Sequence, residues 1–346
     1  MKKSLIALAV AGSFAAPAFA ATSNVDIYGI FGASVDIVDR DQTGVEDEFQ
    51  VSSTASRIGF KGAEDLGGGL SAIWQIESGV NIDGQGTSTW GTRNTFVGLS
   101  SKALGTVKLG RHDTAYKSST GRLDVFGDTL ADYNTVIGSV DGTTAAFDVR
   151  EPNSITYETP NFSGLSGVVT YGQRNEIGNA GADPQLWSLA ASYVNGPLFA
   201  TLAYEMHDDA ASTTTSPDAT KVGLGYNFGN TTVGGIYEMI DGDGNDALER
   251  DAWYLSLKHQ MGNIALKGAY GVADDSDAAG PSDGADFYAV GVDYSLSKRT
   301  TVYALYAGVD NDAAGSYTLG SAGTTGAITT TGGNPNGLSL GVKHSF

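Results

Sequence analysis

The sequence predicts an all-β protein, namely a transmembrane antiparallel up-and-down β-barrel of about 16 strands. Three observations support this fold class. Apolar and polar residues alternate with a period of two along many segments of about ten residues, as in strands with one apolar face. Short turns alternate with long loops, as in a barrel with two unlike ends. Beyond the N-terminal segment, no stretch approaches the roughly 18 uninterrupted apolar residues that a transmembrane helix needs, so any membrane span must be a strand.

The N-terminal segment has the pattern of a cleavable export signal. Lys2 and Lys3 form a short basic end, an apolar run follows, and Ala18-Phe19-Ala20 supplies an A-x-A cleavage site. We therefore expect residues 1–20 to be removed as a signal peptide. The barrel domain is expected to span residues 21–346.

The composition excludes several classes of partner and site. Removal of the two signal lysines leaves 18 basic and 39 acidic residues, a net charge of −21, which argues against a nucleic-acid partner. The absence of cysteine excludes disulfide bonds and thiolate metal sites. The 48 glycines and only 8 prolines suit closely packed, tightly turned strands better than a helical protein.

The alternation begins at the start of the predicted mature chain. Val25 and Ile27 share one parity, whereas Ser34 and Asp36 share the other. Residues 221–228 repeat the pattern most clearly, with small or charged residues on the polar parity, as a wet lumen requires. The predicted strands lie near 25–38, 50–62, 70–80, 92–100, 106–112, 153–160, 165–174, 186–195, 198–207, 221–228, 231–240, 251–260, 264–273, 285–296, 300–309 and 337–346.

Aromatic residues mark the predicted strand ends. Tyrosines such as Tyr204, Tyr237 and Tyr270 suit the aromatic girdles of membrane barrels, although the general β-propensity of tyrosine is an alternative explanation. The last strand alternates up to Phe346. A terminal alternating strand closed by phenylalanine resembles the assembly signal of bacterial outer-membrane barrels.

Four stretches resemble the general bacterial porins, particularly the sixteen-stranded trimeric type of Gram-negative outer membranes. They are residues 25–29, 56–70, 93–99 and 109–111. The resemblance runs from residue 25 to the C-terminus and is most specific before residue 160. It implies a passive, water-filled diffusion channel for ions and small hydrophilic solutes, without enzymatic activity or cofactor. It also implies a homotrimer embedded in outer-membrane lipid and lipopolysaccharide.

The segment between Arg111 and Arg150 is the longest connection in the first half of the chain, and it is rich in apolar residues. The resemblance implies that this third long loop, residues 113–149, folds into the barrel and narrows it. Its Asp124-Val-Phe-Gly-Asp128 segment resembles the acidic tip that porins place at the constriction. An ordinary external loop with a small hydrophobic cluster is the alternative.

Arginines are expected on the wall that faces this acidic tip. Alternation directs both Arg57 and Arg93 into the lumen. Simple parity sends Arg111 outward, so a bulge must reset the phase if the porin match holds there. The placement of Arg150 rests mainly on the resemblance. Arginines opposite Asp124 and Asp128 would create a transverse field that slows apolar solutes.

Secondary candidates for lumen charges are Lys61, Glu77 and Lys108, and each charge singled out here could instead be an ordinary solvated lumen group. Arginines at the constriction favour anions while the acidic loops favour cations, so the sequence leaves the ion preference open.

Other functional signals are weak. The segment 241–246 resembles a calcium loop only superficially, because its sixth position lacks glycine, and we read it as an acidic surface loop. The four histidines show no metal-ligand spacing, and no serine has the context of a nucleophile. The competing classes are an outer-membrane barrel enzyme, which would need a catalytic constellation, and a soluble exported β-sandwich or adhesin.

Overall fold

The computed structural model describes residues 24–41, 48–84, 89–139, 147–174, 184–208, 216–320 and 331–346. The predicted signal peptide, residues 1–20, lies outside these ranges. Within them, no helix is long and apolar enough to cross a membrane.

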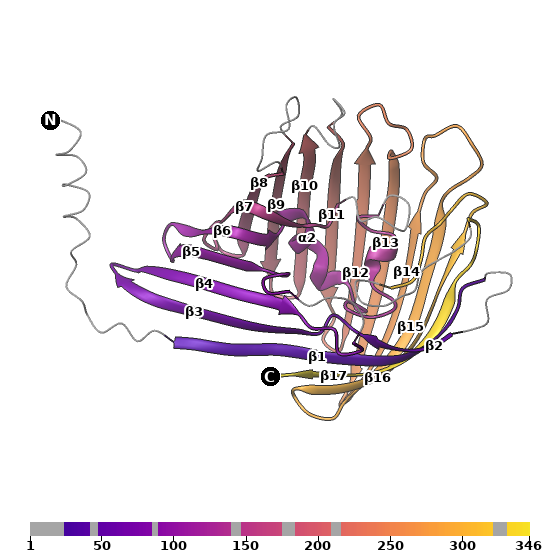
Figure 1. Ribbon diagram of the computed structural model, residues 1–346, viewed down its shortest axis with the longest axis horizontal. Coiled ribbons are helices and arrows are strands. Elements are labelled where there is room, and N and C mark those ends of the chain that lie inside the picture. The colour runs from indigo at the N-terminus through magenta and orange to yellow at the C-terminus, as the bar shows by residue number, and fades with distance from the viewer. Residues whose placement is uncertain are drawn as a thin grey trace.

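The strands form one antiparallel sheet that curves around a central lumen (Figure 1). They are Asn24–Asp39 (β1), Glu48–Ser53 (β2), Arg57–Gly67 (β3), Leu70–Gly79 (β4), Thr95–Ser101 (β5), Gly105–Asp113 (β6), Arg150–Glu158 (β7), Leu165–Gln173 (β8), Gln185–Asn195 (β9), Leu198–Asp208 (β10), Asp218–Asn227 (β11), Thr231–Asp241 (β12), Arg250–Met261 (β13), Ile264–Ala273 (β14), Ala285–Ser295 (β15), Thr300–Asn311 (β16) and Asn336–Ser345 (β17).

The sheet closes because β1 pairs with β17 on one side and with both β2 and β3 on the other. β2 and β3 therefore occupy one position of the wall, and the barrel has 16 strand positions, as the sequence predicts. The predicted strand 50–62 is interrupted, because Ala55 adopts a left-handed conformation with φ of 49°. The Ser56 hydroxyl bridges the gap, since it accepts from the Gly32 N–H at 2.9 Å and donates to the Gly32 carbonyl at 2.8 Å.

Large apolar side chains cover the outer face of the wall. On β1, Val25 is 57% and Ile27 is 61% exposed, whereas Ser34 and Asp36 on the opposite parity are buried inside. In a soluble β-sandwich the apolar parity would be the buried one. The outward apolar belt therefore matches a bilayer, where each such side chain gains roughly 1.5–3 kcal/mol by leaving water.

The predicted aromatic girdle is present at the long-loop end. Tyr237 donates to a carboxylate oxygen of Asp251, and Tyr270 donates to Asp286 Oδ1 at 2.6 Å. In both pairs an outward tyrosine directs its hydroxyl toward an acidic residue nearer the loops. Such an apolar ring with a hydrogen-bonded polar end suits the boundary between hydrocarbon and water, and general β-propensity does not explain these contacts.

The C-terminal residue seals the seam of the barrel. Phe346 N–H donates to the Gly29 carbonyl at 3.1 Å, and Gly29 N–H donates back to the Phe346 carbonyl at 3.2 Å. The Phe346 ring lies 5.2 Å from the Phe31 ring on the outer face. Phe346 is thus part of the closure, while its role as an assembly signal remains a prediction.

The connection between β6 and β7, here called the inner loop (residues 114–149), folds into the barrel, as the resemblance implies. It contains a short helix, Ala115–Thr120 (α2), and two 3-10 turns, Gly121–Leu123 (η1) and Tyr133–Thr135 (η2). Helix α2 packs against β9 and β10 (Figure 1). The reading of this segment as an ordinary external loop is therefore wrong.

Apolar residues of the inner loop form the largest buried cluster of the described chain, together with the wall from β10 to β16. Glycines of the wall provide the room. A Cβ atom added at Gly223 would lie 2.8 Å from Leu123 Cδ1, and one at Gly291 would lie 2.9 Å from Phe126 Cε1. Part of the high glycine content thus serves to seat the loop.

Candidate functional site

The tip of the inner loop contacts the arginine wall through Asp128. Its Oδ2 accepts a hydrogen bond from Arg57 Nη1 at 3.0 Å and lies 3.5 Å from Lys343 Nζ on β17. Arg57 Nη1 also donates to the Ala55 carbonyl at 3.0 Å, so the strand interruption helps to orient this guanidinium. Burial disfavours the ionised form of Asp128, but Arg57 and Lys343 outweigh burial and hold the pKa of Asp128 below 3.8.

Arg93 lies just before β5 and is held by Glu77. Arg93 Nε contacts Glu77 Oε1 at 2.5 Å, and the hydroxyl of Tyr28 donates to Glu77 Oε2 at 2.9 Å. Glu77, a secondary candidate from the sequence, therefore orients one of the predicted arginines. Because a carboxylate between two donors is fixed in position, Arg93 has a defined direction in the lumen.

Arg150 begins β7 and is held by two neighbours. Its Nη2 lies 2.8 Å from Asp113 Oδ1, and its Nε donates to Asn94 Oδ1 at 3.0 Å. The like charges of Arg93 and Arg111 both act on Arg150. These interactions join Arg93, Arg111 and Arg150 in one positively charged region.

A break in the strand register lies beside Arg111. The pairing of β6 with β5 ends at Arg111 without a shift. The pairing of β6 with β7 shifts between Gly110 and His112, with the extra residue on β7, where Asn153 has a positive φ of 47°. This irregularity is at the position where the porin match requires a bulge, and the inward orientation of Arg111 stays a prediction. The Nε of Arg111 is buried and has no hydrogen-bond partner in the described ranges.

Asp124 has a different role from Asp128. Its carboxylate accepts bonds from the backbone of Phe126 at 2.8 Å and Tyr133 at 3.2 Å, and from the Tyr254 hydroxyl on β13 at 3.2 Å. It therefore faces the loop and the wall beneath it, and not the arginines as expected. Burial and the nearby carboxylate of Asp132 raise the pKa of Asp124 well above 3.8.

The contribution of Asp128 to ion selectivity is expected to stay constant between about pH 7 and pH 5. The pKa of Asp128 is lower in the folded channel than the unfolded value of 3.8. The contact with Arg57 is therefore fully present above pH 3.8 and is lost as the pH falls through the folded pKa of Asp128. The measurement is the difference in ion permeability ratio between wild type and Asp128→Asn in planar bilayers. A difference that halves near pH 5 would contradict the ion pair.

The other secondary candidates lie on the side of the constriction that carries the short turns. Lys108 Nζ contacts Glu158 Oε1 at 2.5 Å and His112 Nε2 at 3.1 Å. Lys61 Nζ lies 5.1 Å from the centre of the Tyr28 ring. Both lysines face the lumen but neither contacts the inner loop tip.

Sequence reasoning missed the residues that anchor the inner loop. Lys221 on β11 forms a fully buried ion pair with Asp148 near the end of the loop. Glu238 on β12 accepts a hydrogen bond from the Tyr116 hydroxyl at 2.5 Å and another from the Gly138 N–H at 2.6 Å. The inward parity of Lys221 was visible in the sequence, but its partner on a distant loop was not.

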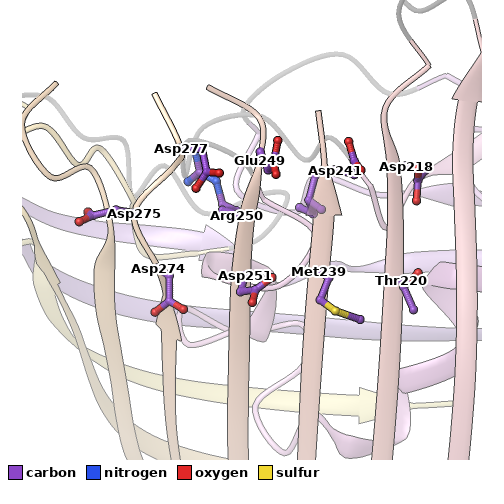
Figure 2. A pocket seen from close by; sticks show the side chains of 11 residues that line it. Asp218, Thr220, Met239, Asp241, Glu249, Arg250, Asp251, Asp274, Asp275 and Asp277 are labelled. Carbon is purple, nitrogen blue, oxygen red and sulfur yellow. The ribbon is translucent and has the colours of Figure 1, made fainter. Parts of the chain in front are cut away.

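An acidic hollow lies at the long-loop end, outside the constriction (Figure 2). It has a volume of about 550 Å³, and neighbouring strand ends contribute its acidic lining, including Asp218, Asp241, Asp251 and Asp274. In the segment 241–246, Asp243 accepts a bond from the backbone of Ser216 at 2.7 Å. Asp241 and Asp251 share the outward parity of Tyr237, so this hollow attracts cations to the outer rim of the barrel.

A closed antiparallel barrel with an outward apolar belt and a charged loop across its lumen defines the class of outer-membrane β-barrel channels. Within this class, the chain belongs to the Gram-negative porins, because the family model for Gram-negative porin matches residues 7–315. It is therefore a protein of the Gram-negative outer membrane and not an enzyme.

Similar proteins come from several Gram-negative bacteria. The major outer membrane protein P.IB of Neisseria gonorrhoeae is 34% identical over 209 residues, which cover 59% of this chain and 56% of the relative. The match thus spans little more than half of that relative's length. The protein of the same name from Neisseria meningitidis serogroup B / serotype 15 (strain H44/76) is 30% identical over 281 residues, covering 67% of this chain and 80% of the relative.

Solved structures show the same fold. The anion-selective porin from Comamonas acidovorans is 26% identical with a TM-score of 0.80, over 94% of this chain and 100% of that chain. The trimer form of OmpT from Vibrio cholerae is 16% identical with a TM-score of 0.67, over 94% of this chain and 99% of that chain. At such low identity the OmpT match supports the fold alone.

Proposed function

We propose that this chain forms a passive, water-filled diffusion channel for ions and small hydrophilic solutes, and that its charged constriction favours anions. The observation that carries the proposal is the contact of the inner loop tip with the basic wall, through Asp128, Arg57 and Lys343. A solute that crosses the barrel must pass beside this loop tip and the charged wall that it contacts. Since dipolar and charged solutes interact with such a field, apolar solutes are slowed.

The preference for anions follows from the balance of charge at the constriction. Four cationic groups gather there with three carboxylates, because Asp124 is turned away toward the wall. The cationic groups are Arg57, Arg93, Arg150 and Lys343, and the carboxylates are Asp128, Glu77 and Asp113. The solved porin from Comamonas acidovorans that this chain resembles is described as anion-selective, which supports the same preference.

The acidic hollow at the outer rim acts in the opposite direction but over a short range. At physiological ionic strength, screening limits its field to about 8 Å, whereas partly buried charges at the constriction are screened much less. The constriction is also the section in which ions are closest to fixed charges. The excess of cationic side chains at the constriction therefore outweighs the acidic side chains of the rim in setting the ion permeability ratio.

Replacement of Lys343 with glutamine is expected to shift the channel toward cations. The test is the reversal potential in a potassium chloride gradient across a planar bilayer, where the wild type should show anion selectivity. Lys298→Gln is the matched control, because it removes the same charge from an exposed turn between β15 and β16. Cation selectivity in the wild type, or equal shifts in both variants, would refute the anion preference.

The proposal includes a homotrimer in contact with outer-membrane lipid and lipopolysaccharide. OmpT of Vibrio cholerae, a barrel of the same fold, is described in a trimer form. Migration on a gel before and after boiling tests it, because a folded trimer should run more slowly than the boiled chain. Identical migration of a detergent-extracted sample would count against it.

A further inference from the structure

A hollow of about 380 Å³ lies in the wall on the short-turn side of the constriction. The strand register places its lining in two adjacent rows. In one row, Asp26, Lys61, Gln75 and Phe96 face each other across β1, β3, β4 and β5. In the next row, nearer the turns, Ala63 on β3 lies opposite Ile73 on β4.

These lining residues face the lumen and not the bilayer. Their direct chain neighbours on the outer parity are exposed on the outside of the barrel, with Ile27 at 61% and Val97 at 59%. Side chains of successive residues in a strand point to opposite faces of the sheet. The hollow is therefore accessible to solutes that have passed the constriction.

Two opposite charges of the hollow stand unpaired. Asp26 and Lys61 are cross-strand neighbours, and such a pair commonly forms an ion pair. In the described part of the chain neither residue forms one, because the Lys61 ammonium lies over the Tyr28 ring instead. Both side chains are exposed to the lumen. The hollow thus offers one cationic group and one anionic group on neighbouring strands.

The remaining lining includes an apolar face. Phe96 lies opposite Gln75, and Ile73 lies two residues from Gln75 along β4, so both apolar side chains line the same hollow. Lys108 Nζ lies 5.0 Å from the centre of the Phe96 ring, but its charge is already compensated by Glu158 at 2.5 Å. The unpaired charges and the apolar face therefore form one composite surface.

We infer that this hollow is a subsite for zwitterionic amino acids with an apolar side chain. The carboxylate contacts Lys61, the ammonium contacts Asp26, and the side chain packs on Ile73 and Phe96. A simple anion would leave Asp26 unmatched, a simple cation would leave Lys61 unmatched, and a sugar would leave the apolar face uncovered. This inference rests on the proposed function, because the solute reaches the subsite through the channel.

The experiment measures how L-leucine reduces the chloride current through single reconstituted channels. The probes that separate its three features are glycine, 4-methylpentanoate and isopentylamine, which lack the side chain, the ammonium and the carboxylate, respectively. L-leucine should block the current at the lowest concentration. The Lys61→Gln and Asp26→Asn variants should each weaken its block by about two- to fivefold, as expected for one solvated charge contact.

In the Phe96→Ala variant, leucine and glycine should block the current equally. The Lys298→Gln channel should be blocked by leucine to the same extent as the wild type. Gel mobility before boiling confirms that each variant is folded. Equal block by leucine and 4-methylpentanoate would overturn the zwitterion assignment, as would unchanged block in both charge variants. A conducting channel without leucine block refutes the subsite alone, whereas a folded barrel that conducts no current refutes the proposed function.

Discussion

Replacement of Lys221 with methionine is expected to release the inner loop from the wall and to make the channel current noisier and larger. Lys221 and Asp148 are both fully buried, and the Lys221 ammonium also lies 4.0 Å from the centre of the Tyr116 ring. Removal of one partner leaves the Asp148 carboxylate buried without its main countercharge, which costs about 3–5 kcal/mol. The barrel wall should remain folded, because its backbone hydrogen bonds do not depend on the side chains of this ion pair.

The sign of the pKa shift supports this expectation. Although burial opposes ionisation, Lys221 and Lys117 hold the pKa of Asp148 below 3.8, so the pair contributes stability at neutral pH. The measurements are single-channel current noise and protease sensitivity of the inner loop in detergent.

The matched control is Arg174→Met. Arg174 pairs with the buried Glu151 of β7 at 3.1 Å, and this ion pair involves none of the described residues of the inner loop. This variant should lose a comparable ion pair without a change in current noise. The double variant Lys221→Met with Asp148→Asn should regain most of the lost anchoring, since no buried charge is then left alone. Equal noise in Lys221→Met and Arg174→Met would refute the anchoring role.

Replacement of residues 121–138 with a short glycine-serine linker is expected to raise the conductance by a factor of about two or more, because the narrowest section dominates the resistance of a pore. The deleted segment includes Phe126, Asp128 and Leu130, which occupy the lumen beside the wall. Selectivity should fall at the same time, because the remaining wall charges then face a wider, more hydrated lumen. Conductance and reversal potential in planar bilayers measure both effects.

Shortening of the 276–282 segment is the control for loop removal. This segment connects β14 to β15 at the rim, outside the buried cluster of the inner loop. Its removal should change the conductance far less than removal of residues 121–138. If the wild type and the inner-loop deletion conduct equally, the inner loop does not form the constriction.

The strands were predictable because their signal is local. Alternation of Val25 and Ile27 with polar neighbours follows directly from the two-residue period of a strand. The interruption at Ala55 was not predictable from this period, because alanine carries no signal for a left-handed conformation. That break depends on the bridge from Ser56 to Gly32, a contact between separate strands.

The constriction was predictable only in part, because its contacts join distant segments. The resemblance indicated that Asp124 and Asp128 lie near the arginines, yet only Asp128 contacts Arg57. Asp124 and Asp128 are alike in sequence, and the difference arises from Tyr254, which lies 130 positions along the chain from Asp124. The face of the wall on which Arg111 lies could not be predicted from the parity of its own strand, because the register shift beside it arises from pairing with the separate strand β7.

The glycine-lined seat of the inner loop has a consequence for the order of folding. The loop follows β6, but the surface that receives it comes largely from later strands, including β11, β14, β15 and β17. That surface does not exist until the C-terminal half has paired. The strands of the C-terminal half must therefore pair before the loop can dock, and we expect the inner loop to narrow the lumen late in folding.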